Sequence, residues 1–215
     1  MTAVIFDVGG VLIDWNPRHL YRKLFAGDGD DAMEWFLAEV CTPEWNLQQD
    51  AGRPFAEAVA ELTRRFPEHA ELIAAYDTRW EEMVRGAHDE TIEIVRELKT
   101  QGTPLYCLTN FSAEKFPSMR RRFDVFDLFD GIVVSAEIGM VKPDPAAYRY
   151  LVERFGLEAS SCLFVDDVEA NVEAAASIGM QAVRYLSSRQ LRRDMRMRGV
   201  LASPGRRLLA PTQSP

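Results

Sequence analysis

Five short apolar segments, each of the length of a buried strand, recur along the chain and are separated by longer segments. They cover residues 2–8, 105–109, 131–135, 162–166 and 181–185. Uninterrupted apolar runs of this length are typical of strands that are buried on both faces, as in a parallel sheet. We expect helices between the last four runs, at about 112–121, 145–155 and 168–178, and before the second run at 89–100. Strands that alternate with helices predict an α/β fold with helices on both faces of a parallel sheet.

The connection after the first strand is different, because from Asp14 to about Gly86 the sequence shows only helical periodicity and no strand-like run. Apolar residues recur there at helical spacing in three groups: Met33, Phe36, Leu37 and Val40; Phe55, Val59, Leu62 and Phe66; and Ile73, Tyr76, Trp80, Met83 and Val84. This pattern predicts a small helical bundle inserted after the first strand. The expected organisation is a catalytic core of residues 1–14 and 87–186, a helical cap of 15–86, and a basic helix or tail of 187–215.

Charge is distributed unevenly along the chain. The net charge is −8, but residues from Ser187 onward contain seven arginines and one acidic residue, so this tail carries +6 and the rest −14. A solvated tail, or a helix lying on the acidic body, is favoured over a nucleic-acid-binding arm. We expect the last dozen residues, rich in Pro, Ser and Gly, to be disordered. The sequence leaves the oligomeric state undecided, with a dimer still open.

The composition is typical of an ordinary globular protein, with 47% hydrophobic and 27% charged residues. No apolar run approaches the roughly 20 residues that a membrane-spanning helix requires. The first residues form a strand-like run rather than a secretion signal, so we expect a cytoplasmic protein. The three cysteines, Cys41, Cys107 and Cys162, are far apart and lack metal-ligand spacing, which predicts buried free thiols.

Polar residues stand at or just after the ends of the predicted strands. Asp7 falls near the end of the first, Thr109 and Asn110 end the second, and Asp166 and Asp167 end the fourth, while Lys142 lies in the loop after the third. Ligands of open parallel sheets bind beyond the carboxyl ends of the strands, so we expect these side chains to converge. Three carboxylates, a hydroxyl and an ammonium suit Mg²⁺ together with an anionic substrate, for which phosphate is the obvious candidate.

Each of these residues also has a purely structural interpretation. Asp7 could cap a strand, Lys142 could be a solvated loop residue, and Asp166 with Asp167 could cap the next helix. The glycines after Asp7 favour phosphate chemistry, because they permit close approach of the backbone to a ligand. Asp14, Trp15, Asn16 and Arg18 lie on the linker into the cap, where a pocket-facing role and a hinge packed by Trp15 are equally compatible with the sequence.

Four segments resemble the motifs of the haloacid dehalogenase-like hydrolase superfamily, in the same order and over nearly the whole chain. They are FDVGGVL, CLTN, SAEIGMVKPDPAAY and FVDDVEAN. The resemblance implies a Rossmann-like core with an α-helical cap inserted after the first strand. It implies that Asp7 is a nucleophile and that Thr109 and Lys142 are also catalytic. The phosphate would be bound by Thr109, Asn110, Lys142 and Gly10, and Mg²⁺ by Asp7, the carbonyl of Gly9, Asp166 and Asp167, with Asn171 one helical turn further on.

Gly9 departs from the pattern of the family's phosphatases, which usually have a second aspartate two residues after the nucleophile as general acid. The backbone carbonyl that binds the metal survives this change, but proton transfer, with a usual value of about 10²–10⁴ in rate, is lost. Such an enzyme should favour good leaving groups, use another acid or be slow. Bacterial sugar-phosphate phosphatases of the family resemble this chain at the same position.

We therefore expect a Mg²⁺-dependent phosphohydrolase of a small phosphorylated metabolite, with a hexose phosphate as the first substrate to test. The alternatives are a 2-haloacid dehalogenase and a non-catalytic, regulatory phosphate-binding module. Dehalogenases also lack the second aspartate but need no metal, so Asp166 and Asp167 would then be uncompensated carboxylates beside the nucleophile. Retention of Asp7, Thr109, Lys142 and Asp167 weighs against the binding module.

Overall fold

The computed structural model describes residues 2–27 and 29–202. Its centre is a five-stranded sheet in the order β5-β4-β1-β6-β7, in which every neighbouring pair is parallel. The strands are β1 (Ala3–Phe6), β4 (Leu105–Thr109), β5 (Gly131–Val134), β6 (Cys162–Asp166) and β7 (Gln181–Arg184). The predicted α/β fold with a Rossmann-like parallel sheet is therefore confirmed.

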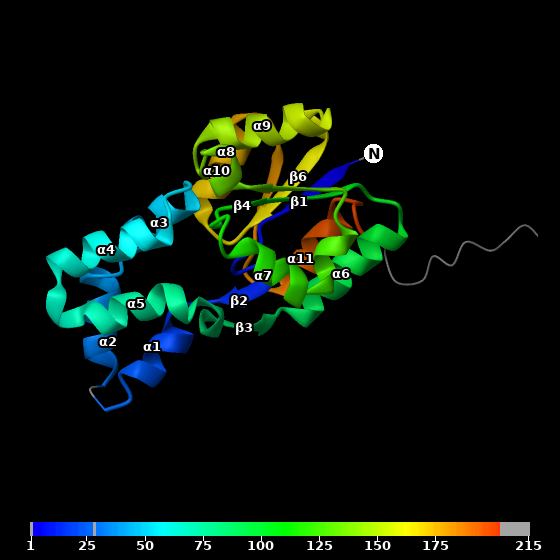
Figure 1. The fold of residues 1–215 in the computed structure, drawn as a ribbon. Helices are drawn as coiled ribbons and strands as arrows, with labels where there is room; N and C mark the ends of the chain where they lie inside the picture. Colours follow the sequence, from blue (N-terminus) through cyan, green and yellow to red (C-terminus); the bar gives the residue numbers. More distant parts are fainter. Residues whose placement is uncertain (1, 28, 203–215) are drawn as a thin grey trace, which may run out of the picture.

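Helices cover both faces of this sheet (Figure 1). Helix α6 (Asp89–Thr100) leads into β4. The α-helices after β4 are α7 (Phe116–Arg122), α8 (Ser135–Ile138), α9 (Pro145–Phe155), α10 (Glu169–Ser177) and α11 (Ser188–Met197). Two short 3₁₀ helices, Asp124–Leu128 and Ala159–Ser161, complete the connections. All four residues of β1 are buried, with Val4 and Phe6 in one hydrophobic cluster and Ala3 and Ile5 in the other. This double burial explains why the strand has no polar positions.

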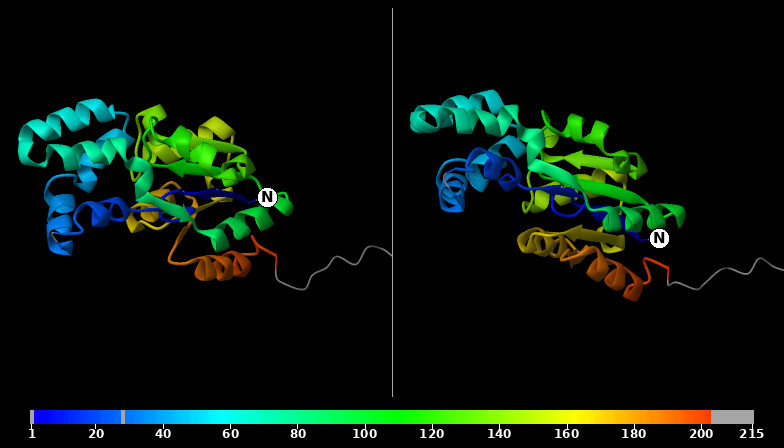
Figure 2. Two further views of the ribbon diagram at one scale, coloured as in Figure 1. Left: turned by 60° about the horizontal axis from the view of Figure 1, so that its bottom comes forward. Right: turned by 90° about the horizontal axis from the view of Figure 1, so that it is seen from below.

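The chain between β1 and α6 forms a second group of helices beyond one end of the sheet (Figures 1 and 2). They are α1 (Arg18–Leu24), α2 (Asp30–Glu39), α3 (Pro43–Asp50), α4 (Phe55–Arg65) and α5 (Ala70–Thr78), with 3₁₀ turns at Pro67–His69 and Trp80–Met83. Aromatic rings fill their interior, with Tyr76 in contact with Tyr21, Trp45 and Phe55. The periodic apolar positions in this region thus serve mainly to pack the helices on one another.

The expectation that residues 14–86 contain no strand is wrong. Strand β2 (Ile13–Trp15) pairs with β3 (Val84–Ala87) in an antiparallel two-stranded ribbon through which the chain enters and leaves the helical group. Helix α5 also ends at Thr78, so the third periodic segment is split among a helix, a 3₁₀ turn and a strand. Strands this short carry too little alternation to be distinguished from the helical pattern beside them.

Helix α7 begins at Phe116 rather than near residue 112. Pro117 at the start of this helix favours initiation there, because it lacks the backbone N–H that the first turn leaves unpaired anyway. The shift leaves residues 110–115 as a loop beyond β4, close to the carboxyl edge of the sheet. By contrast, α9 has the predicted limits, with Asp144 capping its N-terminus and Gly156 in a left-handed conformation at its end.

The basic C-terminal segment forms a helix on the body of the protein. Leu191 and Met195 of α11 are buried, and Arg192 forms an ion pair with Glu97 on α6 at 2.6 Å. Figure 2 shows the two helices side by side. The predicted disordered dozen residues lie outside the part of the chain that the structure describes. All three cysteines are buried free thiols, as predicted.

In the described part of the chain, no helix combines the length and the apolar character that crossing a membrane requires.

Candidate active site

Four polar side chains meet at the carboxyl edge of the sheet. Asp7 directly follows β1, Thr109 ends β4 and Asp166 ends β6, while Lys142 comes from the loop between α8 and α9. The edge is shared because β1 lies between β4 and β6 and pairs with both in parallel. The strand order therefore brings together residues that are more than 100 positions apart in the sequence.

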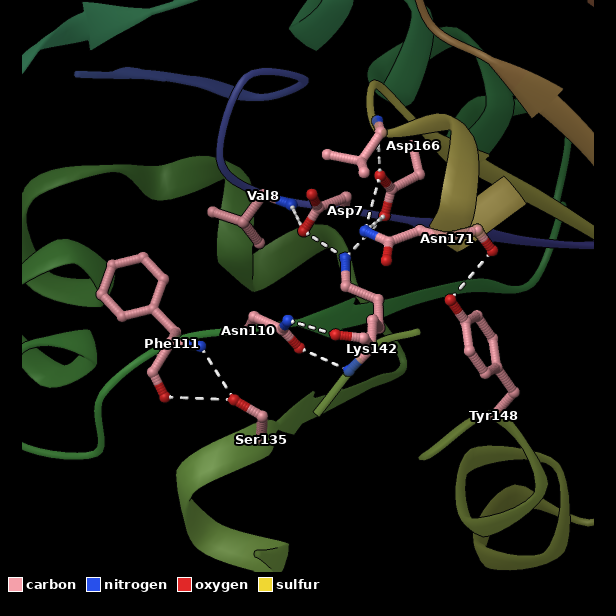
Figure 3. A network of polar contacts seen from close by, with 10 residues as sticks. Asp7, Val8, Asn110, Phe111, Ser135, Lys142, Tyr148, Asp166 and Asn171 are labelled. Carbon is pink, nitrogen blue, oxygen red and sulfur yellow. Dashed lines mark hydrogen bonds and ion pairs between the residues drawn. The ribbon is translucent and has the colours of Figure 1, made fainter. Parts of the chain in front are cut away.

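The ammonium of Lys142 joins two of these carboxylates (Figure 3). Its Nζ lies 2.8 Å from Oδ1 of Asp7 and 2.6 Å from Oδ2 of Asp166. The three residues are 2%, 7% and 0% exposed. A buried charge cluster of this kind is tolerated only when its members are well paired, and the two carboxylates correspondingly raise the pKa of Lys142 so that it stays charged.

Asn110 holds the backbone of Lys142 in place. Its Nδ2 donates to the carbonyl of Lys142 and its Oδ1 accepts from the Lys142 N–H, both at 2.8 Å. The side chain of Asn110, which the sequence predicts to bind phosphate, thus contacts the loop that carries Lys142 (Figure 3). The structure assigns the amide a positioning role, and substrate binding by Asn110 remains a prediction.

Asp166 is held by several donors besides Lys142. Its Oδ1 accepts from the N–H of Val168 at 2.9 Å, and Asn171 Nδ2 lies 3.0 and 3.1 Å from its two oxygens. The carbonyl of Asn171 in turn accepts from the hydroxyl of Tyr148 at 2.9 Å. These contacts fix the orientation of Asp166. Asn171 is the additional metal ligand that the sequence predicts, and its side-chain nitrogen contacts the Asp166 carboxylate.

Asp7, Asp166 and Asp167 each offer one oxygen, and these three oxygens lie within 4.8 Å of one another. Together with Lys142 they give the edge a formal charge of −2, which attracts a divalent cation. Hard oxygen donors at this spacing fit Mg²⁺. The donor set therefore matches the predicted metal, with Asp7 and Asp167 having fewer protein partners than Asp166.

Burial raises the pKa of the Asp7 carboxyl from 3.8 to about 7, the charge of Asp166 adds to this rise, and Lys142 and the N–H of Val8 oppose it. Burial and the charge of Asp166 also raise the pKa of Asp167. Crowded carboxylates of this kind resist ionisation unless a cation joins them. The raised pKa values and the spacing of the carboxylate oxygens thus both favour a bound divalent cation.

Glycine is required at position 10 because a side chain there would collide with Asp167. Its φ is +74°, and a Cβ there would lie 2.5 Å from Oδ2 of Asp167. We expect Gly10→Ala to lower stability by about 1–3 kcal/mol through backbone strain. By displacing Asp167 it should also weaken Mg²⁺ binding by about 10–100-fold.

Calorimetric titration with Mg²⁺ and thermal unfolding in EDTA check both parts. Gly9→Ala is the matched control, because among the described residues no atom outside residues 8–10 lies within 4 Å of the Cβ position at Gly9, and its φ is not left-handed. Equal losses in the two variants would contradict the contact-based explanation.

The hydroxyl of Thr109 is buried, and its oxygen has no hydrogen-bond partner among residues 2–27 and 29–202. Unsatisfied buried hydroxyls are uncommon in native proteins and call for a ligand or water that completes them. Thr109 lies at the end of β4, the strand that pairs with β1 and thus flanks Asp7. The arrangement suits an anion bound between the two strand ends.

One cavity lies between the helical group and this edge, and a second lies within the helical group. The smaller, about 60 Å³, is lined by Gly9, Trp15, Asn46, Asp50, Trp80, Asn110, Phe111 and Ser112. The larger, about 620 Å³, lies among α1, α2, α3 and α5 and shares Trp15 and Asn46 with the smaller one. Of the four linker residues, Trp15, Asn16 and Arg18 line the larger cavity, whereas Asp14 pairs with His19 at 2.9 Å.

Sequence reasoning missed the residues that the inserted helices contribute to the smaller cavity. Asp50, at the end of α3, and Asn46, one turn earlier, face the same space as Gly9. Nothing in the local sequence distinguishes Asp50 from the other acidic residues of the helices. Its carbonyl accepts a hydrogen bond from Ser135 Oγ, which also accepts from the N–H of Phe111, so α3 is fastened to the sheet's edge.

Comparison with known proteins identifies this architecture. The family model described as haloacid dehalogenase-like hydrolase matches residues 1–179. The chain is 35% identical over 204 residues to Phosphatase MT3486 of Mycobacterium tuberculosis, covering 88% of each chain. It is 30% identical over 190 residues to Sesquiterpene phosphatase astK of Aspergillus oryzae, covering 86% of this chain and 90% of that one.

A solved structure agrees at the level of the fold. A HAD family enzyme of Bacteroides thetaiotaomicron, in complex with magnesium and inorganic phosphate, superposes with a TM-score of 0.65. It is 21% identical in sequence, and the match covers 87% of this chain and 95% of that one. The family match over most of the chain, together with the strand-end residues described above, shows that this protein belongs to the haloacid dehalogenase-like hydrolase family.

Proposed function

We propose that this hydrolase is a Mg²⁺-dependent phosphatase of small phosphorylated metabolites that acts through an aspartyl-phosphate at Asp7. The observation that carries the proposal is the buried Asp7–Lys142–Asp166 cluster beside Asp167, together with the hydroxyl of Thr109, which has no partner in the described part of the chain. This combination offers a nucleophile, a cation site and an anion site within one edge of the sheet. The phosphatase relatives support the same activity.

Asp7 has a defined orientation for attack. The N–H of Val8 and the ammonium of Lys142 contact Oδ1, at 2.7 and 2.8 Å. Within the described residues, this arrangement leaves lone pairs on Oδ2 for attack on phosphorus (Figure 3). The leaving oxygen departs on the opposite side of the phosphorus, in line with the attack, and water later hydrolyses the aspartyl-phosphate.

Lys142 and Thr109 bind the transferring phosphoryl group in this mechanism. The fixed charge of Lys142 offsets the negative charge that spreads over the equatorial oxygens, and the Thr109 hydroxyl donates to one of them. When bound by Asp7, the Gly9 carbonyl and Asp167, Mg²⁺ supplies further charge neutralisation. Asp166 and Asn110 keep Lys142 in position through the contacts described above.

In this proposal the rest of the substrate lies in the two cavities. In-line departure directs the leaving group away from Asp7, toward the smaller cavity and then the larger one, which share Trp15 and Asn46. The larger cavity combines apolar residues with polar ones at Asn16, Arg18 and Glu34. Its volume of about 620 Å³ accommodates a hexose, and a larger, partly apolar alcohol also fits.

The decisive assay measures phosphate release from p-nitrophenyl phosphate and acetyl phosphate, with Mg²⁺ or with EDTA. Good leaving groups need little protonation, so these substrates report on the nucleophile and the cation site alone. We expect Mg²⁺-dependent release, after which sugar phosphates and isoprenoid phosphates are compared as natural leaving groups. Chloride release from 2-chloropropionate without phosphate release would instead identify a dehalogenase, and no turnover with retained phosphate binding would identify a binding module.

A further inference from the structure

Gly9 leaves an empty position where a general acid is expected. Apart from residues 8–10 themselves, no atom of the described structure lies within 4 Å of the place where a Cβ would stand on Gly9. The space lies beside the smaller cavity, which Gly9 itself lines. A proton donor for the leaving oxygen therefore has room at this place, provided that another part of the chain supplies it.

Asp50 lines the same cavity as Gly9. Among the eight lining residues, it is the one with a titratable side chain. Its backbone is fastened by the hydrogen bond from Ser135 Oγ, and Gly52, with φ +107°, lies so close to the core that a Cβ would stand 3.1 Å from the carbonyl of Ala136. The end of α3 is thus held against the edge of the sheet that carries Asp7.

The Asp50 carboxyl is also oriented. Asn46, four residues earlier on α3, donates from Nδ2 to Oδ2 of Asp50 at 3.0 Å. Burial and the nearby charge of Asp7 raise the pKa of Asp50 to about 7, while Lys142 and the N–H of Ser112 oppose the rise. A carboxyl with a raised pKa retains its proton near neutral pH, as a general acid requires.

We propose that Asp50, contributed by the inserted helices, is the general acid and base that replaces the absent carboxylate at Gly9. The proposal rests on the phosphatase function proposed above. As Asp7 attacks, the bond between phosphorus and the leaving oxygen breaks, and the proton of Asp50 passes to that oxygen to release a neutral alcohol. In the second step Asp50, now a carboxylate, takes a proton from the water that attacks the aspartyl-phosphate. Phosphate leaves, and both Asp7 and the protonated Asp50 are restored.

This assignment makes the position of the helical group part of the chemistry. The proton donor reaches the substrate only while α3 is docked on the core, so a leaving group is protonated only when the cavity is closed around it. Further contacts hold this docking: Lys115 with Asp77, and Glu114 Oε1 with the N–H of Phe55 at 3.0 Å. Asp50 thereby couples proton transfer to the docking of α3 on the core.

The test compares Asp50→Asn with the wild type on two kinds of substrate. For phenyl phosphate and glucose 1-phosphate, whose leaving oxygens need a proton, we expect kcat/KM to fall by about 10²–10⁴-fold. For p-nitrophenyl phosphate, whose leaving group is stable as an anion, the loss should stay below about tenfold. Retained p-nitrophenyl phosphate hydrolysis also shows that the variant is folded and binds Mg²⁺.

Asp31→Asn is the matched control, because it neutralises an exposed carboxylate of α2 that lies outside both cavities and outside the contacts that dock the helical group. It should affect good and poor leaving groups equally. The double variant Gly9→Asp/Asp50→Asn should recover part of the lost activity on phenyl phosphate, since the open space at Gly9 admits the side chain. If Asp50→Asn does not fold, Asp50→Ala gives the same comparison.

Equal losses on both kinds of substrate, or no loss on phenyl phosphate, would overturn the assignment of Asp50. A wild-type protein that hydrolyses neither p-nitrophenyl phosphate nor acetyl phosphate with Mg²⁺ would instead overturn the proposed phosphatase function. The two failures are therefore distinguished by the wild-type assay on good leaving groups.

Discussion

Replacing Asp7 with asparagine is expected to lower phosphate release from p-nitrophenyl phosphate by on the order of 10⁴-fold or more, because an amide oxygen is too weak a nucleophile to form the phosphoenzyme. The substitution keeps the shape of the side chain, so Lys142 and Val8 retain an oxygen to contact. Steady-state release of p-nitrophenol with saturating Mg²⁺ measures the effect.

A stability measurement separates loss of the nucleophile from loss of the fold. Burial raises the pKa of Asp7 from 3.8 in the unfolded chain to about 7, so the folded state binds a proton more tightly than the unfolded one. The wild-type protein in EDTA should therefore lose stability as the pH rises from about 4 to 7, and Asp7→Asn should lose less. Near pH 8 we expect the variant to unfold at a temperature no lower than the wild type.

Asp124→Asn is the control for this substitution, because its side chain is 83% exposed and its ion-pair partner is Arg96 on α6, outside the Asp7–Lys142–Asp166 cluster. It should leave both activity and unfolding temperature unchanged. Residual activity of Asp7→Asn above about one hundredth of the wild type would argue against covalent catalysis by Asp7.

The second large effect is expected for Lys142→Met, which should lower the free energy of unfolding by about 3–5 kcal/mol in EDTA. The ammonium lies between two buried carboxylates, at 2.8 and 2.6 Å, and its removal leaves them facing each other without a counter-charge. Methionine has a similar volume, so the loss reports on charge rather than on a cavity. Urea unfolding followed by circular dichroism gives the value, and phosphatase activity should be lost as well.

Lys99→Met provides the matched control. Lys99 forms a comparably short ion pair with Asp130, at 2.6 Å, but both side chains are more than a third exposed. Solvent screens such pairs, so this variant should change the stability by no more than about 1 kcal/mol.

A double variant tests the electrostatic explanation. Asp7→Asn/Lys142→Met removes one of the two carboxylates that face each other, and it should be more stable than Lys142→Met alone. If the effects of the two substitutions on the free energy of unfolding were additive, the buried charges would not be coupled, and the electrostatic explanation would fail.

The core of the protein and most of its site could be predicted from the sequence. The apolar runs that form β1, β4 and β6 are buried on both faces, so they contain no polar residue until they reach the edge of the sheet. The polar side chains of the site therefore stand immediately at the strand ends, where the change from apolar to polar residues along the sequence reveals them. Gly10 is visible for a similar reason, because its requirement for a left-handed backbone arises within the same short loop.

The inserted helices show the limit of this approach. Their apolar periodicity indicates which faces pack together, and it led to the correct expectation of a helical bundle. It also obscured the ribbon of β2 and β3, because pairing between Ile13–Trp15 and Val84–Ala87 joins segments about 70 residues apart. Neither strand is long enough to show its own alternation.

The sequence by itself determined the parallel sheet, the edge at which the candidate site lies and the residues Asp7, Thr109, Lys142, Asp166 and Asp167 that meet there. Those features follow from local hydrophobic pattern and from the rule that parallel strands present their carboxyl ends on one side. Only the tertiary structure decided that Asn110 holds Lys142 and that Asp50 lines the same cavity as Gly9. Both depend on how loops and helices distant in the sequence dock on that edge, and docking is set by three-dimensional packing, which leaves no periodic trace along the chain.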